Sequence, residues 1–455
     1  MYTLLFKRFI LLLSLFIIST FQNVKAQMNV LFADTLEQTL AQFASNNNME
    51  GVASAVVFPD GTTWSSATGH YGANPLHTNL LFDIGSNTKS MISTIILMLE
   101  EEGKLSINDT LYKYINPIPN VPNSISLKLL LNHRSGIANY TEHPDFIDTL
   151  FADPSFFWHP DTVLKHFTFA PLFPAGTAYD YSNTNYVLLG QVIETVEGKP
   201  LNQVLYDRIF SPLQMHKSYL DSYDSYTLGK TGAYMSPGNY WGTHFNALSS
   251  GAWAAGAVVS TPDDFAWWCY KLFRGDILSP LSFNRMKIGT NFSNGDVYGL
   301  GIEQRTYKGR KYFMHGGTTM QNSEMHYSQE SDFSVVVMDL DQGFYAKTYN
   351  LQLALIDVLE YASDQPLSIE ENRRSIELNA YPNPSNSTVQ IDIPSELQNE
   401  EIRIEVYDSM GKLIFHEKSR SNKITLNKSD FGIGMFWVKT FSESELFETL
   451  SVVFN

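Results

Sequence analysis

The sequence of 455 residues predicts a large domain of mixed α/β class followed by a small all-β sandwich domain. Helical and strand patterns alternate along the chain up to about Tyr361, as in a mixed α/β domain. Beyond that residue, short alternating segments are separated by turn residues, as in a β-sandwich. The length also fits one large and one small domain better than a single domain.

The elements of the large domain follow from hydrophobic spacing. Residues Ser90–Glu102 carry apolar side chains at helical intervals, which predicts a buried helix that starts near Ser86. Val52–Phe58 and Ser334–Leu340 are short runs rich in β-branched residues, which predict strands. The same region therefore supplies both a core helix and a sheet.

The charge and the cysteine count exclude several classes of protein. The formal net charge of -16, with no basic cluster, disfavours nucleic acid or anionic lipid as a partner. Cys269 is the only cysteine, so an intramolecular disulfide and a multi-cysteine metal site are excluded. Cys269 stands in an apolar run, and we expect a buried structural thiol. His143, His159, His244 and His326 show no metal-ligand spacing.

The N-terminus predicts export. Lys7 and Arg8 precede the apolar run Phe9–Ile18, and small residues precede a cleavage site after Ala26. Residues 1–26 are therefore predicted to be a signal peptide. The alternative is a membrane anchor, but the run is shorter than the ~20 residues that span a bilayer. No later segment is long and apolar enough to span, so the mature chain is predicted to have no transmembrane span.

Composition changes mark the domain boundaries. We assign residues 27–362 to the larger domain, the polar residues 363–378 to a linker, and residues 379–455 to the small domain. The predicted strands of the small domain are Thr388–Ile393, Ile402–Tyr407, Lys412–His416, Lys423–Leu426 and Met435–Thr440.

A candidate nucleophile stands at the start of the buried helix. Ser86 and Lys89 form an S-x-x-K motif, and a separation of three residues brings two side chains together on one helical face. A serine hydroxyl needs a neighbouring base, and a lysine with a lowered pKa can serve as one. The helix N-terminus also favours an oxyanion on the attacked carbonyl. The motif by itself occurs by chance in many proteins.

Three further motifs stand after Ser86 in the chain. Tyr181-Ser182-Asn183 is a Y-x-N motif, His315-Gly316-Gly317 stands in the place of a K-T-G or H-x-G motif, and Leu130–Ile137 reads L-L-x-H-x-S-G-I. With Ser86 and Lys89, these motifs resemble the serine β-lactamases and penicillin-binding proteins, especially class C β-lactamases and DD-carboxypeptidase-like enzymes. The resemblance covers residues 29–361. It implies a β-lactamase/transpeptidase-like fold, an antiparallel sheet flanked by helices.

The resemblance implies roles for the first two motifs. Ser86 is the acyl-accepting nucleophile and Lys89 its activating partner. Tyr181 carries a proton between Ser86, Lys89 and the leaving group, and Asn183 donates to the substrate amide. This acyl-transfer chemistry needs neither a metal nor an organic cofactor.

The third motif completes the implied site. His315 faces the pocket, Gly317 lets the strand approach the substrate, and the backbone NH groups of Ser86 and Thr318 form the oxyanion hole. Many family members have a glycine where Met320–Asn322 stand here, so we expect a reshaped pocket rim. Histidine in place of lysine also makes recognition of a substrate carboxylate by a permanent cation less assured.

His133, within the L-L-x-H block, is a second histidine near the implied site. We expect it to bond backbone near the pocket rather than to act as the catalytic base.

Four readings of the activity stay open. The first is a DD-carboxypeptidase-like or β-lactamase-related hydrolase of peptides or amides. The second is an esterase on the same scaffold, and the third is a true β-lactamase. The fourth is a non-catalytic binding protein that retains the fold.

The small domain has its own resemblance. Tyr381–Pro384, Val406–Lys412 and Gly434–Lys439 resemble, in order, the C-terminal sorting domain of the type IX secretion system. This implies passage across the outer membrane by the type IX machinery to the cell surface or medium, with frequent removal of the domain on arrival. Such a location favours exogenous peptides, esters or cell-wall fragments as substrates. The alternative is a carbohydrate-binding or adhesive β-sandwich.

Overall fold

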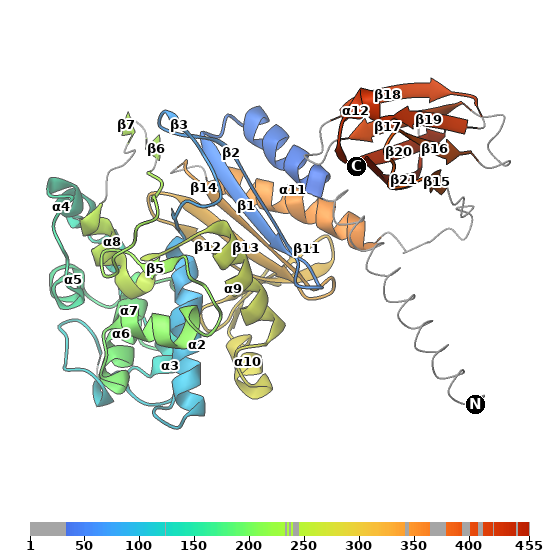
Figure 1. Cartoon of the computed structure of the whole chain (residues 1–455). Helices are drawn as coiled ribbons and strands as arrows, with labels where there is room; N and C mark the ends of the chain where they lie inside the picture. Colours follow the sequence, from blue (N-terminus) through green and yellow to red (C-terminus); the bar gives the residue numbers. More distant parts are fainter. Residues whose placement is uncertain are drawn as a thin grey trace, which may run out of the picture. The chain divides into compact units, whose positions relative to one another are not determined.

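The chain divides into two compact units, Met1–Asp364 and Gln365–Asn455. The computed structural model shown in Figure 1 describes residues 33–122, 124–232, 234–235, 238–239, 245–341, 345–364, 379–393, 401–407, 413–421, 423–442 and 445–454. The predicted signal peptide, residues 1–26, and residues 365–378 of the predicted linker lie outside these ranges. Each unit is described by itself below.

A nine-stranded antiparallel sheet forms the centre of the first unit. The strand order is β3-β2-β1-β14-β13-β12-β11-β10-β9. Its strands are β1 (Gly51–Val57), β2 (Thr63–Tyr71), β3 (Asn74–Pro75), β9 (Thr290–Asn291), β10 (Val297–Tyr298), β11 (Glu303–Tyr307), β12 (Arg310–Thr318), β13 (Asn322–Ser328) and β14 (Phe333–Asp339). Val52 pairs with Asp339, so strands from the two ends of the unit meet at the middle of the sheet. The predicted strands Val52–Phe58 and Ser334–Leu340 are confirmed within one residue.

Helices cover both faces of this sheet. Because side chains alternate along a strand, Val52 and Val56 of β1 join one core cluster while Ala53 and Ala55 join the other. The first cluster is covered by a helix over residues 33–46 and by α11 (Tyr345–Asp364). The second is covered by α9 (Pro262–Arg274) and the helical region beyond it (Figure 1).

The helical region is built around α2 (Thr88–Glu101), which is buried along nearly its whole length. A 3₁₀ turn, η1 (Gly85–Asn87), precedes α2 and holds Ser86, so the predicted start of the helix is confirmed. The other helical elements are η2 (Leu111–Lys113), α3 (Leu127–Leu131), η3 (Tyr140–Glu142), α4 (Phe146–Ala152), α5 (Pro160–Phe167), α6 (Asn183–Glu197), α7 (Leu201–Leu205), η4 (Tyr206–Phe210), α8 (Asn246–Ala252), η5 (Trp253–Ala255) and α10 (Pro280–Met286).

Two small sheets complete the unit, a three-stranded sheet of order β4-β8-β5 and the hairpin β6-β7. Their strands are β4 (Phe82–Asp83), β5 (Ser218–Leu220), β6 (Tyr234–Met235), β7 (Gly238–Asn239) and β8 (Val258–Ser260).

The described residues of the second unit are all-β apart from one short helix. It contains a three-stranded sheet, β15-β16-β19, and a four-stranded sheet, β18-β17-β20-β21. Val389 and Ile391 of one sheet share a core cluster with Ile404, Val406 and Val438 of the other, as the β-sandwich prediction requires. The elements are β15 (Asn379–Tyr381), β16 (Thr388–Asp392), β17 (Ile402–Tyr407), β18 (Leu413–Ser419), β19 (Lys423–Asn427), α12 (Lys428–Phe431), β20 (Gly434–Ser442) and β21 (Glu445–Phe454).

The sequence analysis did not include β15 and β21. Residues 408–412 of the second sorting-domain block lie outside the described residues. In the described part of the chain, no helix combines the length and the apolar character needed to cross a membrane.

Candidate active site

Two glycines allow the element that holds Ser86 to pack against strand β12. Gly85 has a φ of +52°, and a Cβ at this position would lie 2.9 Å from the backbone nitrogen of Thr318. A Cβ on Gly317 would lie 2.1 Å from the carbonyl oxygen of Ile84. Any larger residue would therefore separate the two backbones. The backbone next to Ser86 and the backbone at Thr318 are thus close neighbours, although they come from opposite ends of the unit.

Lys89 is completely buried one helical turn after Ser86. Its Nζ lies 2.8 Å from the Ser86 Oγ, 2.7 Å from the Asn183 Oδ1 and 2.6 Å from the carbonyl oxygen of Ala255. The two carbonyl oxygens can only accept hydrogen bonds, so they occupy two N–H groups of the lysine. The third position of the nitrogen points at the serine hydroxyl.

The environment of Lys89 favours the uncharged amine. Burial lowers the pKa of Lys89 well below its usual value of 10.5. As a neutral amine, Nζ would still donate to Asn183 and Ala255, and its lone pair would face the hydroxyl of Ser86. The arrangement can therefore accept the proton of Ser86.

The amide of Asn183 is held from both ends. Its Oδ1 accepts from Lys89, and its Nδ2 donates to the Thr141 Oγ1 over 3.3 Å. Its backbone N–H donates to the Asn139 Oδ1 over 3.1 Å. Asn183 thus positions Lys89, and the predicted donation from Asn183 to a substrate amide stays a prediction.

Tyr181 lies beside Lys89 and Ser86. The Lys89 Nζ is 5.0 Å from the centroid of the Tyr181 ring, and the rings of Tyr181 and His133 are 4.2 Å apart. Burial raises the pKa of Tyr181 well above its usual value, and hydrogen bonding to Ser86 opposes this shift. Tyr181 is therefore a phenol at neutral pH, with a proton to give.

Two histidines and a tyrosine form a buried chain of hydrogen bonds behind Tyr181. The His133 Nε2 lies 3.0 Å from the Tyr298 Oη, which lies 3.1 Å from the His315 Nε2. The backbone N–H of Ser182 donates to the His133 Nδ1, so the proton of His133 is on Nε2. The His315 Nδ1 lies 2.6 Å from the carbonyl oxygen of Gly316, so the proton of His315 is on Nδ1. Tyr298 therefore accepts from His133 and donates to His315.

Both histidines of this chain are neutral at pH 7. Burial lowers the pKa of His315 to about 4. Burial also lowers the pKa of His133 well below its usual value. The sequence left the charge of His315 open, and the structure assigns the neutral form. The expected bond from His133 to nearby backbone is the contact with Ser182.

Sequence reasoning missed three groups that hold the site together. Tyr298 lies on β10 outside any motif, and Thr141 lies in η3. Ala255 contributes only its backbone oxygen, at the end of a turn in which Trp253 has a φ of +39°. The small residues around Ala255 were the one signal of a tight turn there.

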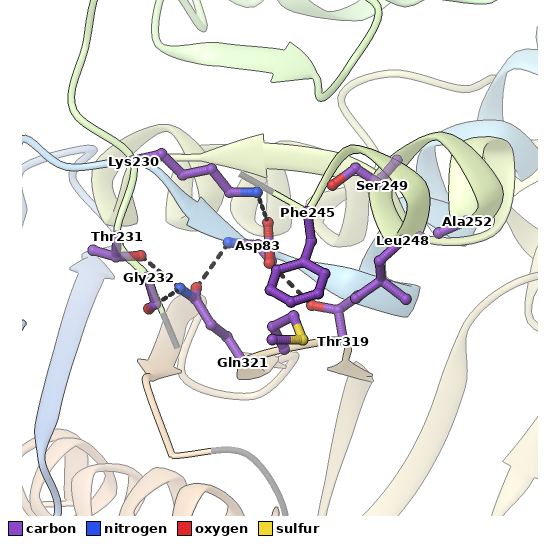
Figure 2. A pocket seen from close by; sticks show the side chains of 13 residues that line it. Asp83, Lys230, Thr231, Gly232, Phe245, Leu248, Ser249, Ala252, Thr319 and Gln321 are labelled. Carbon is purple, nitrogen blue, oxygen red and sulfur yellow. Dashed lines mark hydrogen bonds and ion pairs between the residues drawn. The ribbon is translucent and has the colours of Figure 1, made fainter. Parts of the chain in front are cut away.

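A pocket with about 440 Å³ of space, which includes open solvent, is lined by the chain neighbours of the site, Gly256 after Ala255 and Thr319 after Thr318, while Ser86, Lys89, Tyr181 and His315 are not among its lining residues. Figure 2 shows its walls. Met320 and Gln321, in the segment where the sequence departs from the family pattern, line the pocket. Gln321 is fixed there because its Oε1 accepts from the backbone N–H of Asp83 and its Nε2 donates to the Thr231 Oγ1. The lining residues are Asp83, Lys230, Thr231, Gly232, Phe245, Leu248, Ser249, Ala252, Gly256, Ala257, Thr319, Met320 and Gln321.

Cys269 is buried, as predicted, and its Sγ donates to the carbonyl oxygen of His326. His244 lies outside the described residues. Among the residues that the structure describes, no three His, Cys, Asp or Glu side chains gather in a way that could hold a metal ion.

The antiparallel sheet, the helical region and the Ser86 cluster together define the class of serine hydrolases that includes the penicillin-binding proteins. A family model described as Beta-lactamase matches residues 36–346, more than half of the chain. The chain belongs to this family. A second model, described as a secretion system C-terminal sorting domain, matches residues 379–453, so the small domain is a sorting domain of the type IX system.

Individual relatives agree with this assignment. PbpX of Bacillus subtilis (strain 168), whose name describes a penicillin-binding protein, is 30% identical over 232 residues, 50% of this chain and 54% of the relative. A teichoic acid D-alanine hydrolase of Staphylococcus aureus (strain MRSA252) is 31% identical over 214 residues, 45% of this chain and 50% of the relative. The chain spans about half the length of these curated relatives.

Among solved structures, the fold is similar to that of the D-amino acid amidase from Ochrobactrum anthropi SV3. The two are 25% identical with a TM-score of 0.62, and the match covers 73% of this chain and 98% of the amidase. Hydrolases thus stand among both the sequence relatives and the structural neighbours.

Proposed function

We propose that this protein is an exported serine hydrolase that forms an acyl-enzyme on Ser86 with amide or ester substrates. The leading activity is hydrolysis of peptide or amide bonds in the manner of a D-alanyl-D-alanine carboxypeptidase. One observation carries the proposal: the buried Lys89 Nζ lies 2.8 Å from the Ser86 Oγ. The relatives named as a penicillin-binding protein and as a D-alanine hydrolase support the same chemistry.

The first half of the cycle acylates Ser86. Its Oγ attacks the substrate carbonyl carbon while the proton moves to the Lys89 Nζ, whose pKa is lowered by burial. The carbonyl oxygen becomes an oxyanion between the backbone NH groups of Ser86 and Thr318, which the glycine contacts bring together. His315 and Gly317 flank this position on β12.

The leaving group then departs with a proton from Tyr181. The tetrahedral intermediate collapses, the bond to the leaving group breaks, and the Tyr181 phenol protonates that group. Lys89 returns its extra proton to Tyr181, over whose ring its Nζ lies. A water molecule then attacks the carbonyl carbon of the acyl-enzyme while the Lys89 Nζ takes one of its protons. The bond from that carbon to the Ser86 Oγ breaks, Lys89 passes the proton to the Oγ, and the carboxylic acid leaves.

An esterase on the same scaffold is the second candidate. The observation that favours it is the burial of Tyr181, which raises the pKa of the phenol well above its usual value. A weak acid helps an amine leaving group less than a strong one does, and an alcohol leaving from an ester needs less help.

The sorting domain suggests where the reaction takes place. We propose that residues 1–26 are removed as a signal peptide and that the type IX machinery carries residues 27–362, the linker 363–378 and the domain 379–455 across the outer membrane. The substrates would then be peptides, esters or cell-wall fragments outside the cell. Fractionation of the native host followed by intact mass of the mature protein tests this, and a form confined to the periplasm would contradict it.

Intact-mass spectrometry after incubation with a penicillin and, separately, with p-nitrophenyl acetate tests the activity. We expect a covalent adduct or turnover that Ser86→Ala abolishes. An adduct with penicillin supports the peptide or amide hydrolase, and turnover of the ester alone supports the esterase. If neither compound reacts with the wild-type chain, the acyl-enzyme proposal is wrong and the binding-protein reading takes its place.

A further inference from the structure

We infer that the pocket lined by Asp83 binds a positively charged ammonium group of the substrate, so that the acyl part of the substrate is an aminoacyl group with a free amine. The inference rests on the proposed acyl-enzyme at Ser86 and names the substrate class of that site. Three features of the described residues carry it: the place of the pocket, its charge and its apolar wall.

The pocket shares its backbone with the catalytic cluster. The lining residue Asp83 comes just before the turn that holds Ser86, and the lining residue Thr319 directly follows Thr318. Gly256, another lining residue, follows Ala255, whose carbonyl oxygen accepts from Lys89. A Cβ on Gly256 would lie 3.5 Å from the carbonyl carbon of Gly85. A group bound in the pocket therefore lies within reach of a carbonyl carbon attacked by Ser86.

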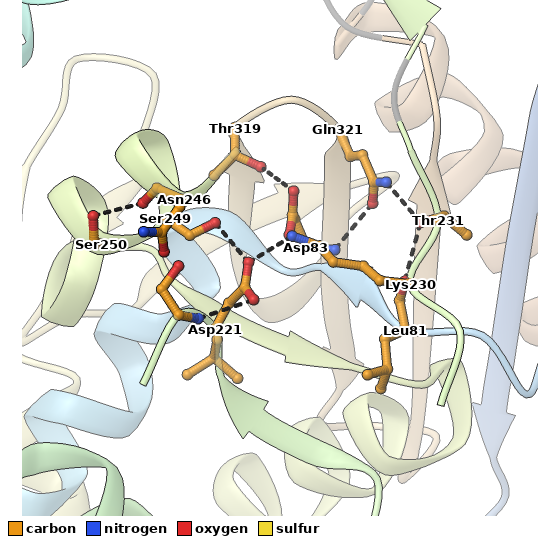
Figure 3. A network of polar contacts seen from close by, with 12 residues as sticks. Leu81, Asp83, Asp221, Lys230, Thr231, Asn246, Ser249, Ser250, Thr319 and Gln321 are labelled. Atoms are coloured by element: carbon orange, nitrogen blue, oxygen red, sulfur yellow. Dashed lines mark hydrogen bonds and ion pairs between the residues drawn. The ribbon is translucent and has the colours of Figure 1, made fainter. Parts of the chain in front are cut away.

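Two charged side chains that line the pocket, Asp83 and Lys230, contact each other, and Lys230 also contacts Asp221, which is not a lining residue (Figure 3). The Lys230 Nζ lies 2.8 Å from the Asp83 Oδ1 and 2.6 Å from the Asp221 Oδ2. Burial alone would lower the pKa of Lys230, but the charges of the two carboxylates raise it overall, so Lys230 is a cation. Two carboxylates and one ammonium leave a formal charge of about -1.

The two carboxylates differ in what they can still accept. Asp221 is nearly fully buried, and it also accepts from Ser249 and Tyr226, each over 2.6 Å. The Asp83 side chain is 12% exposed and faces the pocket. It accepts from Lys230 on Oδ1 and from the Thr319 Oγ1 on Oδ2 over 3.2 Å. Because a carboxylate has sites for about four hydrogen bonds, Asp83 has the capacity to receive an ammonium N–H.

The rest of the wall excludes the opposite charge. Among the lining residues that the structure describes, Lys230 is the sole cation, and two carboxylates already neutralise it. His315, the residue that replaces the family's lysine, is not a lining residue, and burial lowers its pKa to about 4, so it adds no positive charge nearby. A substrate carboxylate in this pocket would be repelled. Phe245, Leu248 and Met320 offer an apolar surface for a small side chain next to the ammonium.

Three matched substrates test the inference on the full-length chain. They are alanine p-nitroanilide with a free amine, its N-acetyl derivative, and lactoyl p-nitroanilide, in which a hydroxyl replaces the amine; each is tested as both enantiomers. We expect the free amine to have a kcat/KM about 10- to 100-fold above that of either neutral compound, the range for a hydrogen bond to a charged group.

The variant Asp83→Asn keeps the size of the side chain and removes one negative charge. We expect the ratio of kcat/KM for the free amine over the lactoyl compound to fall about tenfold. Asp109→Asn, at an exposed pair with Lys113, is the matched control and should keep the wild-type ratio. Thermal unfolding of both variants checks that they are folded.

The outcomes separate the two proposals. If the wild-type protein has the same kcat/KM for the neutral compounds as for the free amine, the ammonium inference is wrong while the Ser86 chemistry stands. The same holds if Asp83→Asn keeps the wild-type preference for the free amine. If no compound is hydrolysed and no adduct forms, the proposed function fails and the inference fails with it.

Discussion

Two polar clusters adjoin Ser86, and they differ in charge. His133, Tyr298 and His315 form a buried chain of hydrogen bonds in which every partner is neutral at pH 7. The charged cluster at the pocket contains Lys230 between two carboxylates. The first cluster packs against the Tyr181 ring, and Asp83 and Lys230 of the second cluster line the pocket.

The difference separates two tasks. A cation next to Lys89 would add to the cost of a second positive charge when Lys89 takes up a proton, and neutral histidines reduce that cost. Hydrogen bonds with fixed donors and acceptors also hold the rings without reorganisation during the reaction. On the proposed mechanism, the neutral cluster serves proton transfer and the charged cluster serves the choice of substrate.

Removal of the Lys89 amine, which the neutral cluster adjoins, has the largest expected effect on kcat/KM. Lys89→Met keeps the apolar stem and deletes the base, and we expect kcat/KM to fall by about 10³-fold or more. Adduct formation measured by intact mass should slow to the same extent. Lys113→Met at an exposed ion pair is the control. A loss below tenfold would mean that another group activates Ser86.

The next-largest loss of activity is expected when the backbone at Ser86 is pushed away from β12. Gly85→Ala places a Cβ 2.9 Å from the Thr318 nitrogen, and we expect kcat to fall by about 10²- to 10³-fold, the range for loss of an oxyanion donor. Gly309→Ala has a similar positive φ and open space around its Cβ, so it should lose about 1 kcal/mol of stability and little activity. Equal activity loss in both variants would contradict the role given to this contact.

Acid should destabilise the neutral cluster. The pKa of His315 is about 4 in the folded chain and about 6.5 in an unfolded one. The stability from this side chain is therefore fully present above pH 6.5 and is lost as the pH falls toward 4. The slope is at most about 1.4 kcal/mol per pH unit, or ~3 kcal/mol in all. Urea unfolding at pH 7.5 and 5.0 should show a smaller pH effect in His315→Asn than in wild type; an equal effect would refute the assignment.

Loss of the Tyr298 hydroxyl, which lies between the two histidines, is expected to have the smallest of these effects on stability and activity. Tyr298→Phe leaves the His133 Nε2 and the His315 Nε2 without their common partner, and we expect a loss of about 1–2 kcal/mol in stability and about tenfold in kcat. Since Tyr298 donates to neutral His315, its loss should also move the acid limb of the pH profile of kcat/KM upward. Tyr219→Phe, which removes an exposed hydroxyl bond, should leave the limb in place. An unchanged profile in Tyr298→Phe would make its role purely structural.

The fold and the catalytic motifs could be predicted where local pattern carries the signal. The helix that presents Lys89 is apolar at helical spacing, and β1 and β14 are runs of β-branched residues. Tyr181 and His315 were found through family resemblance, because no spacing links them to Ser86. Strand β21 was missed because Glu445–Phe454 mixes charged and apolar residues without strict alternation.

Contacts between residues that are far apart in the chain left no pattern in the sequence that could predict them. Tyr298 bridges residues 133 and 315, and Ala255 acts through its backbone. The charged cluster brings Asp83, Asp221 and Lys230 together from separate segments of the chain. Single charged residues are common in any sequence, so these three gained meaning only when the structure gave their distances.

The pairing of β1 with β14 joins the first strand of the large unit to one of its last. Synthesis delivers Ser86 long before Thr318, and contacts between distant segments are slow to form. The Ser86 turn can meet β12 only after the chain up to Thr318 has been made. A nascent chain therefore carries Ser86 without the backbone NH group of Thr318. On the proposed mechanism, acylation of Ser86 has to wait until β12 has joined the sheet.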